Sequence, residues 1–178
     1  ILDIFLNSLL LIITFNHDLW EIIILSLYVS FIALIIGSVL GILFGYYLAL
    51  KVFIFKNIIL IVINSLMGIP PVVVGLIVYF IFASGGPLGI FELLYSPTAM
   101  IIAQIIIIFP IVASISHEIF FKNWHEFKDE FRSLNMPYFG IAKILVGHSY
   151  SLIITALLSA YGRAISEVGA VMIVGGNI

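Results

Sequence analysis

Long stretches without a charged residue constrain this chain more than any other feature. Three such runs contain 29, 35 and 25 residues, and they lie between Glu21 and Lys51, between Lys56 and Glu92, and between Glu92 and Glu118. A helix that crosses about 30 Å of hydrocarbon needs about 20 predominantly apolar residues, so each run is long enough to span a membrane. The apolar residues are continuous and do not alternate as in barrel strands, which favours helices.

The composition excludes a soluble domain. Hydrophobic residues make up 63% of the 178 residues and charged residues 9%, whereas soluble domains have about 45–50% apolar and about 25% charged residues. A globule of this size cannot bury so much apolar surface. Seven Lys and Arg residues are too few for a nucleic-acid-binding protein. The absence of cysteine excludes disulfides and cysteine-ligated metals.

We expect four membrane spans, over residues 19–50, 57–83, 97–121 and 149–174. The first is long enough to be tilted in the bilayer. Residues 1–15 repeat apolar side chains at helical spacing but are short for a span. An interfacial amphipathic helix is favoured there over a truncated transmembrane helix.

Basic residues indicate which connections face the cytoplasm. Six of the seven lie in the connections that follow the first and third spans: Lys51, Lys56, Lys122, Lys128, Arg132 and Lys143. Because cytoplasmic loops are enriched in Lys and Arg, both connections are expected inside. Residues 1–18, the loop 83–97 and the chain end near Gly176 are then expected on the outer side.

The insert 122–148, between the third and fourth spans, is patterned as a helical hairpin. Asn123, with an acidic residue three positions later, is typical of a helix N-terminus. Asn135 tolerates the left-handed conformation that often ends a helix, and Pro137 prevents its continuation. A second short helix is expected over residues 138–146.

Apolar side chains recur along the first helix of this insert at helical spacing, and charged residues cover its other faces. The apolar residues are Trp124, Phe127, Phe131 and Leu134. In one interpretation the aromatic stripe packs on the spans of the protein itself. In the other, the insert docks to a cytoplasmic partner through aromatic anchors and a charged rim.

Three stretches together resemble the permease subunits of ATP-binding-cassette (ABC) importers, specifically the tungstate permease family. They run from Asn64 to Gly75, from Ser96 to Ala113, and from Gly162 to Ile178, whose Arg-x-x-x-Glu-x-Gly-Ala core is also similar to molybdate permeases. The resemblance implies an all-α polytopic membrane protein with a type I importer (MetI-like) core of about four to five transmembrane helices and a cytoplasmic coupling helix. It also implies a further span after residue 178.

The resemblance places the family's coupling motif, Glu-Ala-Ala-x-x-x-Gly, on residues 129–135. Asp129 replaces Glu, Glu130 and Phe131 replace the two alanines, and Asn135 replaces Gly. The resemblance implies that the insert couples to a separate ABC ATPase subunit. The expected coupling residues are Trp124, Phe127, Asp129, Glu130, Phe131, Arg132 and Asn135.

The resemblance also implies a second permease copy, which makes a homodimer, and an extracytoplasmic substrate-binding protein that delivers the anion. The sequence contains no Gly-x-x-x-x-Gly-Lys-Ser/Thr phosphate loop, so ATP is expected on the partner subunit. We expect no cofactor, metal ligand or catalytic residue in the chain, which sits in the lipid bilayer and binds no nucleic acid.

Arg163 and Glu167 lie four residues apart within the expected fourth span. Charges at membrane depth are costly and seldom face lipid. One interpretation is an ion pair that serves helix packing and a hinge, and the other is that both residues line the anion path. We favour the ion pair, because a neighbouring carboxylate cancels much of the attraction of Arg for an oxyanion.

Several other residues at membrane depth are candidates for the path or gate. Pro70 and Pro71 interrupt the hydrogen bonding of the second span near its middle. A kink there is expected to hold the gate region and to expose backbone groups to the anion. Asn64, Ser65 and Gln104 are polar, and bonds between helices are favoured for them over contact with the substrate.

Gly37, Gly41 and Gly45 form two overlapping Gly-x-x-x-Gly repeats within the first span. Such repeats allow the backbones of two helices to approach closely. We therefore predict that these glycines pack against another helix and take no part in the transport path.

We conclude from the sequence that the chain is the permease subunit of a plasma (inner) membrane importer for tungstate, or alternatively for molybdate or a related oxyanion. An ion-coupled secondary transporter is the rival, but no carboxylate lies on the span that Pro70 and Pro71 break. A membrane-embedded enzyme is also disfavoured, because the chain has no paired catalytic groups at one depth. His117 and Glu118 do not make a zinc hydrolase, because the fourth residue after His117 is Phe121.

Overall fold

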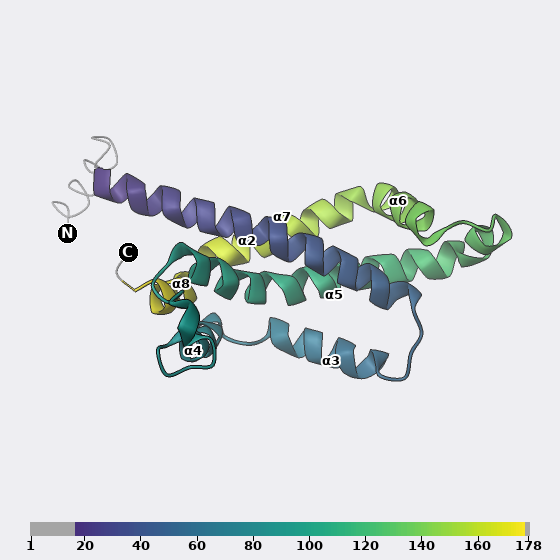
Figure 1. Ribbon diagram of the computed structural model, residues 1–178. Helices are drawn as coiled ribbons and strands as arrows, with labels where there is room; N and C mark the ends of the chain where they lie inside the picture. Colours follow the sequence, from purple (N-terminus) through teal and green to yellow (C-terminus); the bar gives the residue numbers. More distant parts are fainter. Residues whose placement is uncertain (1–16, 177–178) are drawn as a thin grey trace.

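The computed structural model describes residues 17–176, and the elements in this part of the chain are all helical (Figure 1). They are α2 (His17–Leu50), α3 (Lys56–Met67), α4 (Pro71–Phe82), the short 3-10 helix η1 (Gly89–Phe91), α5 (Pro97–Ser133), α6 (Tyr138–His148), α7 (Tyr150–Ser166) and α8 (Val168–Gly175). The expected all-α class is confirmed. The interfacial helix expected over residues 1–15 lies outside the described residues.

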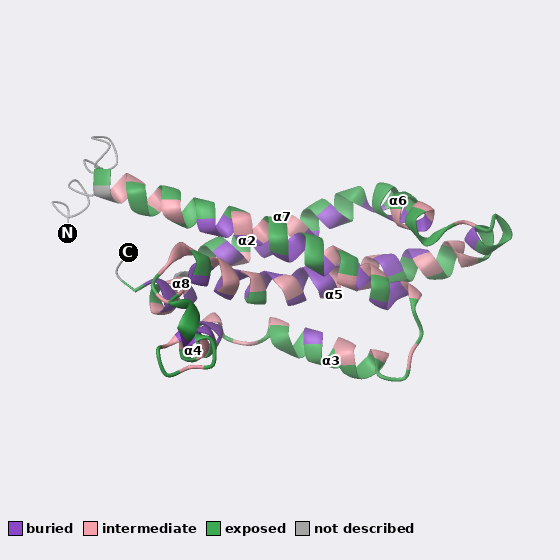
Figure 2. Ribbon diagram, viewed as in Figure 1, coloured by how far each residue is buried: buried purple, intermediate pink, exposed green. Residues whose placement is uncertain are grey.

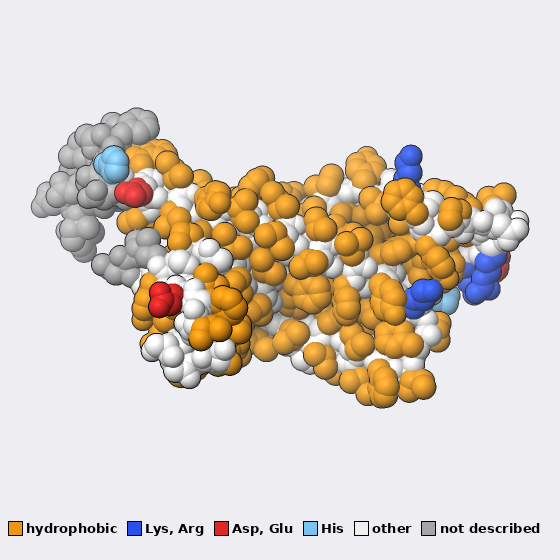
Figure 3. All heavy atoms as spheres, in the orientation of Figure 1, with side chains coloured by type: hydrophobic (Ala, Val, Ile, Leu, Met, Phe, Trp, Pro, Cys, Tyr) orange, Lys and Arg blue, Asp and Glu red, His pale blue; other side chains and the backbone are white. Residues whose placement is uncertain are grey.

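Two helices, α2 and α5, are long and apolar enough to cross a membrane singly. The bent pairs α3–α4 and α6–α7 each meet the same test when the pair is taken together. Large apolar side chains cover the outside of the molecule between its two ends (Figures 2 and 3). The Lys and Arg side chains visible in Figure 3 lie at the end that holds the α5–α6 turn. This is the end that the charge pattern assigns to the cytoplasm.

Helices α2 and α5 lie side by side and form the longest contact of the fold (Figure 1). A Cβ atom at Gly37 would lie 2.9 Å from Ile108 Cγ2, and one at Gly45 would lie 2.7 Å from the carbonyl oxygen of Ala113. Gly41 is equally close to α5. The predicted role of these glycines in helix packing is confirmed, because a larger side chain would separate the two backbones.

The break at Pro70 and Pro71 is much sharper than the expected kink. Helix α3 ends at Met67, α4 begins at Pro71, and the two axes are bent by 103°. Pro71 has no N–H for a helical hydrogen bond, and it pushes Pro70 into an extended conformation with ψ of 130°. Residues 57–83 therefore form two short helices at nearly a right angle, joined by an elbow at residues 68–70.

The helix start expected at Asn123 is wrong. Helix α5 continues from Pro97 to Ser133, and Ser96 caps it by accepting a hydrogen bond from the backbone N–H of Ala99. Asn123 is buried, and its amide donates to the hydroxyl of Ser149. Its polar side chain meets a partner distant in sequence rather than the N–H groups of a helix start.

The turn after α5 agrees with the prediction. Asn135 has a φ of 49°, in the left-handed region, and α6 begins at Tyr138 directly after Pro137. Helices α6 and α7 are bent by 76° at Ser149. The helix expected over residues 149–174 is interrupted, since α7 ends at Ser166 and α8 begins after Glu167.

Candidate functional site

The end of α5 and helix α6 form a hairpin, and its apolar core also includes Ala49 of α2 and Ile153 of α7. Phe131 is 6% exposed, and its ring stacks on Trp124 with the centroids 6.1 Å apart. The ring centroid of Phe127 lies 6.3 Å from that of Phe131, on the same side of α5. From α6, Ile141 and Leu145 are buried against this cluster. The aromatic residues of the predicted stripe therefore face the inside of the hairpin, whereas its last member, Leu134, is 71% exposed.

The structure limits which of the expected coupling residues are exposed. Phe131 is buried by the chain itself, whereas Trp124 and Phe127 are half-buried and Trp124 lines an open hollow. Phe131 is therefore part of the packing, and the coupling role of Trp124 and Phe127 stays a prediction. Among the expected coupling residues, the exposed ones are Asp129, Glu130, Arg132 and Asn135.

Three apolar residues around the turn are exposed, and one of them, Leu134, belongs to the predicted stripe. Leu134 is 71% exposed, Phe139 is 84% exposed, and Tyr138 is also exposed. The buried residues of α6 are Ile141 and Leu145, and Phe139 lies on another face of this helix, so its place in the helical period already indicates an outward position. Tyr138 shares the face of Ile141 and Leu145 but is exposed at the first residue of the helix, which the helical period does not predict. These side chains give the tip of the hairpin an apolar surface beside exposed charges.

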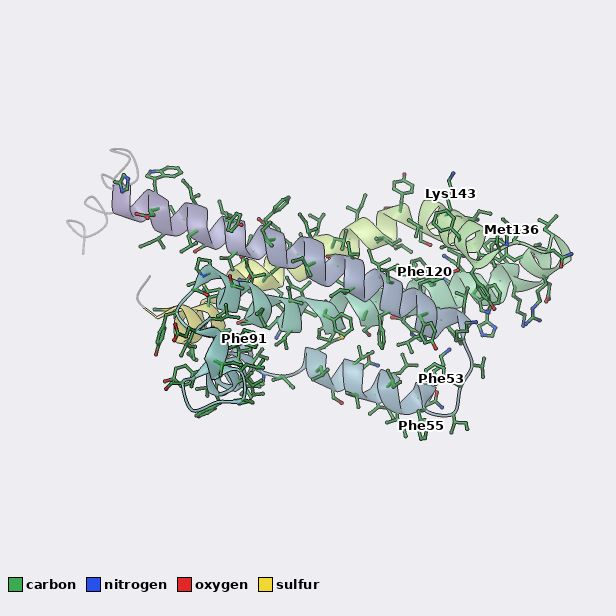
Figure 4. All side chains as sticks on the ribbon, in the orientation of Figure 1. Phe53, Phe55, Phe91, Phe120, Met136 and Lys143 are labelled. Carbon is green, nitrogen blue, oxygen red and sulfur yellow. The ribbon has the colours of Figure 1, made fainter. Side chains whose placement is uncertain are left out.

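A hollow of about 510 Å³ lies beside the tip, between the end of α2 and the hairpin. Figure 4 labels Met136 among the side chains of this end of the molecule. The residues that line the hollow are Leu50, Trp124, Phe131, Arg132, Asn135, Met136, Tyr138 and Ile141. The apolar packing between α2 and the tip is consequently incomplete.

A buried polar side chain, that of Gln104, lies among the apolar spans. Gln104 on α5 is 3% exposed, and its amide nitrogen is 3.2 Å from Ser30 Oγ on α2 and 3.4 Å from the carbonyl oxygen of Ala164 on α7. Its amide oxygen has no hydrogen-bond partner within residues 17–176. A small cavity of about 70 Å³ adjoins it, and Glu167 lines the other side. Gln104 thus joins three helices at membrane depth.

Arg163 and Glu167 lie next to this cavity at the junction of α7 and α8. Arg163 Nε is 3.6 Å from Glu167 Oε1, and the side chains are 39% and 25% exposed. Nε is buried and makes no hydrogen bond in the described part of the chain. Glu167 is the residue between α7 and α8, so the ion pair links the end of α7 to the break between the two helices.

The candidate path residues do not converge on one site. On α3, Asn64 accepts a hydrogen bond from Ser114 Oγ on α5 at 2.6 Å, and Ser65 bonds to the carbonyl of Ile61 in its own helix. Ser114 and Gln104 are ten residues apart on α5, which corresponds to about 15 Å along the axis. Polar links therefore hold α3 and α7 to α5 at different depths.

The outer end of the molecule is built around the α4–α8 contact. A Cβ atom at Gly75 of α4 would lie 2.9 Å from the Cα of Ala170 on α8, so the two short helices meet closely. The loop that leads to α5 is tied to α8, because the N–H of Tyr95 donates to the carbonyl of Val174 at 3.0 Å. The elbow after α3 leads directly into this outer assembly (Figure 1).

Among residues 17–176, no three His, Cys, Asp or Glu side chains gather where they could hold a metal ion. His117 stacks on Phe121 with the ring centroids 5.5 Å apart, and His125 meets the same ring at 4.5 Å. These histidines take part in an aromatic cluster on one side of α5.

Comparison with known proteins agrees with this description. Residues 37–178 match the family of binding-protein-dependent transport system inner membrane components. A probable anion ABC transporter permease protein of Haloferax volcanii is 42% identical over 86% of this chain and 66% of its own length. The tungstate uptake system permease protein TupB of Peptoclostridium acidaminophilum is 35% identical over 94% of this chain and 74% of its own length.

A second TupB, from Campylobacter jejuni, is 37% identical over 69% of this chain and 52% of its own length. The chain therefore spans about half to three quarters of the length of these relatives. The family match covers most of the chain, including α5, the hairpin and the junction of α7 and α8. The chain belongs to the family of inner membrane components of binding-protein-dependent transport systems and is an all-α membrane permease component.

Proposed function

We propose that this chain is the membrane-spanning subunit of an ABC importer that carries tungstate into the cell. The observation that carries the proposal is the likeness to a tungstate uptake permease, 35% identical over 94% of this chain. A second protein of the same name supports it. The structure is consistent with a carrier, since it combines apolar spans with broken helices at its outer end.

A separate ATPase supplies the energy in this proposal. It docks on the exposed face of the hairpin, where Leu134 and Phe139 stand beside the charged residues Asp129, Glu130 and Arg132. Apolar anchors within a charged rim suit a protein partner. Closure of two ATPase subunits on ATP binding displaces the hairpin.

Helix α5 gives this displacement a path across the membrane. It runs without interruption over 37 residues, from the tip of the hairpin to the outer loop, a length of about 55 Å. The buried Asn123–Ser149 hydrogen bond fixes the base of the hairpin to the start of α7. A push at the tip therefore moves α5 and α7 together.

The outer assembly of α4 and α8 is the proposed gate. Each of these helices is short and is joined to its neighbour through a break, at Pro70–Pro71 for α4 and at Glu167 for α8. Helices joined in this way rotate about the breaks without unwinding. A second copy of the chain completes the path, and a substrate-binding protein delivers the anion at the outer loop, residues 83–96.

Molybdate is the alternative cargo. The Haloferax volcanii relative is named only for an anion, and molybdate, like tungstate, is a tetrahedral divalent oxyanion. Because the two ions share their shape and charge, we assign the selection between them to the binding protein.

The proposal is tested with the complete transporter in liposomes, with the ATPase inside and the binding protein outside. Uptake is measured by elemental analysis of tungsten, with and without ATP, and with molybdate as competitor. We expect tungsten uptake that requires ATP hydrolysis. Uptake that needs no ATP and collapses with an ionophore would instead indicate a secondary transporter and would contradict the proposal.

A further inference from the structure

The first residue of α6 is held from two sides by the inner end of α2. The hydroxyl of Tyr46, in the last turns of α2, donates to the backbone carbonyl of Tyr138 at 2.6 Å. Lys51, the first residue after α2, donates to the Tyr138 hydroxyl at 3.3 Å. The Lys51 ammonium also lies 4.3 Å from the centroid of the Tyr138 ring, close enough for a cation–π interaction.

These contacts bridge the place where packing is incomplete. The hollow of about 510 Å³ separates part of the end of α2 from the tip of the hairpin, and both Leu50 and Tyr138 line it. Tyr46 is itself firmly placed, because its ring meets the fully buried ring of Phe120 edge-on at 5.8 Å. The inner end of α2 and helix α6 share an apolar cluster that includes Ala49 and Ile141, and the fixed Tyr46 hydroxyl adds a polar tether between these helices beside the hollow.

The connection between α2 and α3 is also held at its second end, where α3 begins. Residues 51–55 join α2 to α3, and the ammonium of Lys56 at the start of α3 lies 4.9 Å from the ring centroid of Phe121 on α5. Figure 4 shows Phe53 and Phe55 on this connection, at the hairpin end of the molecule. The corner between α2 and α3 is therefore attached to α6 through Lys51 and to α5 through Lys56.

We propose that Tyr46 and Lys51 are positioning residues that pass the displacement of the hairpin to the α2–α3 corner. The proposal rests on the proposed function of the chain as an ATP-driven permease. When the hairpin moves, Tyr138 draws the corner with it, and α3 carries the motion to the elbow at Pro70–Pro71. Without the tether, less of the hairpin's displacement reaches the α2–α3 corner and the outer gate for each ATP hydrolysed.

The test measures tungstate uptake and phosphate release at the same time, in liposomes that contain the complete transporter. Tyr46→Phe removes the hydroxyl and keeps the ring against Phe120. We expect ATP hydrolysis to continue and the uptake per ATP to fall by about threefold to tenfold, the range that the loss of one hydrogen bond predicts. Tyr47→Phe is the matched control, because Tyr47 is exposed and its ring contacts Phe53; its ratio should stay unchanged.

Lys51 provides an independent arm of the test. Lys51→Gln should lower the uptake per ATP, and Lys51→Arg should restore it because the cation remains. Tyr138→Phe removes the acceptor of Lys51 but leaves the carbonyl that Tyr46 binds. Combining Lys51→Gln with Tyr138→Phe should therefore lower the ratio less than the two separate effects added together.

Two outcomes would overturn the inference in different ways. If the wild type takes up tungstate and Tyr46→Phe has the same uptake per ATP, or loses uptake and hydrolysis equally along with folded protein, the tether has no role in coupling. If the wild type itself shows no ATP-dependent uptake, the proposed function fails and the inference fails with it.

Discussion

The pair α2–α5 and the pair α4–α8 both meet through small residues, but their helices differ in length and continuity. Glycines of α2 touch α5 along two helices of 34 and 37 residues that run unbroken through the apolar part of the molecule. Gly75 touches Ala170 between helices of 12 and 8 residues, each joined to the chain by a break. Close packing of continuous helices transmits motion, whereas close packing of short, hinged helices permits it.

The largest expected effect lies where the continuous pair extends into the hairpin. Phe131→Ala removes a ring that is 6% exposed and stacked on Trp124, a loss of about 3–5 kcal/mol for a buried aromatic residue. We expect the hairpin to lose its fold and the ATPase to dissociate from the permease, as measured by co-purification. Ile144→Ala, at an exposed site of α6 outside the docking face, should leave the hairpin folded and the complex intact. An intact complex with Phe131→Ala would contradict the assignment of this ring to the core.

The second test acts on the glycine contact of the continuous pair. Gly45→Ala places a Cβ against the backbone of Ala113 and His117, which should cost about 1–3 kcal/mol by overpacking. We expect a lower midpoint of thermal unfolding in detergent. Gly162→Ala is the control, since nothing lies within 4 Å of the added atom and alanine favours the helix. Equal stability of the two variants would refute the close contact.

The third test acts on the elbow of the broken pair. Pro71→Ala restores an N–H at the start of α4 and relaxes the restriction on residue 70. Its effect on stability should stay below about 1 kcal/mol, because Pro71 is the first residue of α4 and removes no helical hydrogen bond there. Tungstate uptake per ATP should nevertheless fall, because a less fixed elbow passes less motion to α4. If uptake per ATP is unchanged, the elbow does not pass motion to α4, and this prediction is contradicted.

The smallest effect on stability is expected for the ion pair at the second break. Arg163 and Glu167 are 3.6 Å apart, and replacing both charges of a pair in an apolar medium by neutral side chains of similar volume is often nearly neutral. The double variant Arg163→Gln/Glu167→Gln should therefore have nearly the wild-type thermal stability and uptake, whereas Glu167→Gln alone leaves an unpaired guanidinium at membrane depth and should be less stable. If Arg163 instead binds the anion, Arg163→Gln alone should abolish uptake and Glu167→Gln should raise it, which separates the two interpretations.

The sequence predicted those elements whose signals are local. Asn135 and Pro137 end α5 where expected, because the left-handed conformation and the missing N–H are properties of these residues themselves. The pattern around Asn123 predicts a helix start, which is wrong because a capping Asn and a buried Asn amide have the same local sequence. Its bond to Ser149, 26 residues later, is a property of the tertiary structure.

The candidate site divides in the same way. Helical spacing correctly placed Trp124, Phe127 and Phe131 on one face, but it does not say whether that face meets a partner or the chain itself. The structure turns it toward Ile141 and Leu145, because a hairpin needs an apolar face to close on. The 103° elbow at Pro70 and Pro71 also required the structure, since prolines fix a break but the packing of α4 on α8 sets its angle.

The most direct test of the central claim is a photo-cross-linking residue at Phe139, 84% exposed at the tip of the hairpin, in the complete transporter in membranes. The account predicts a covalent product with the ATPase subunit, and it predicts no such product from a cross-linking residue at Leu145, which is buried inside the hairpin. Products formed only with lipid or with the permease itself, in the presence and absence of ATP, would contradict the claim that the hairpin couples this permease to its source of energy.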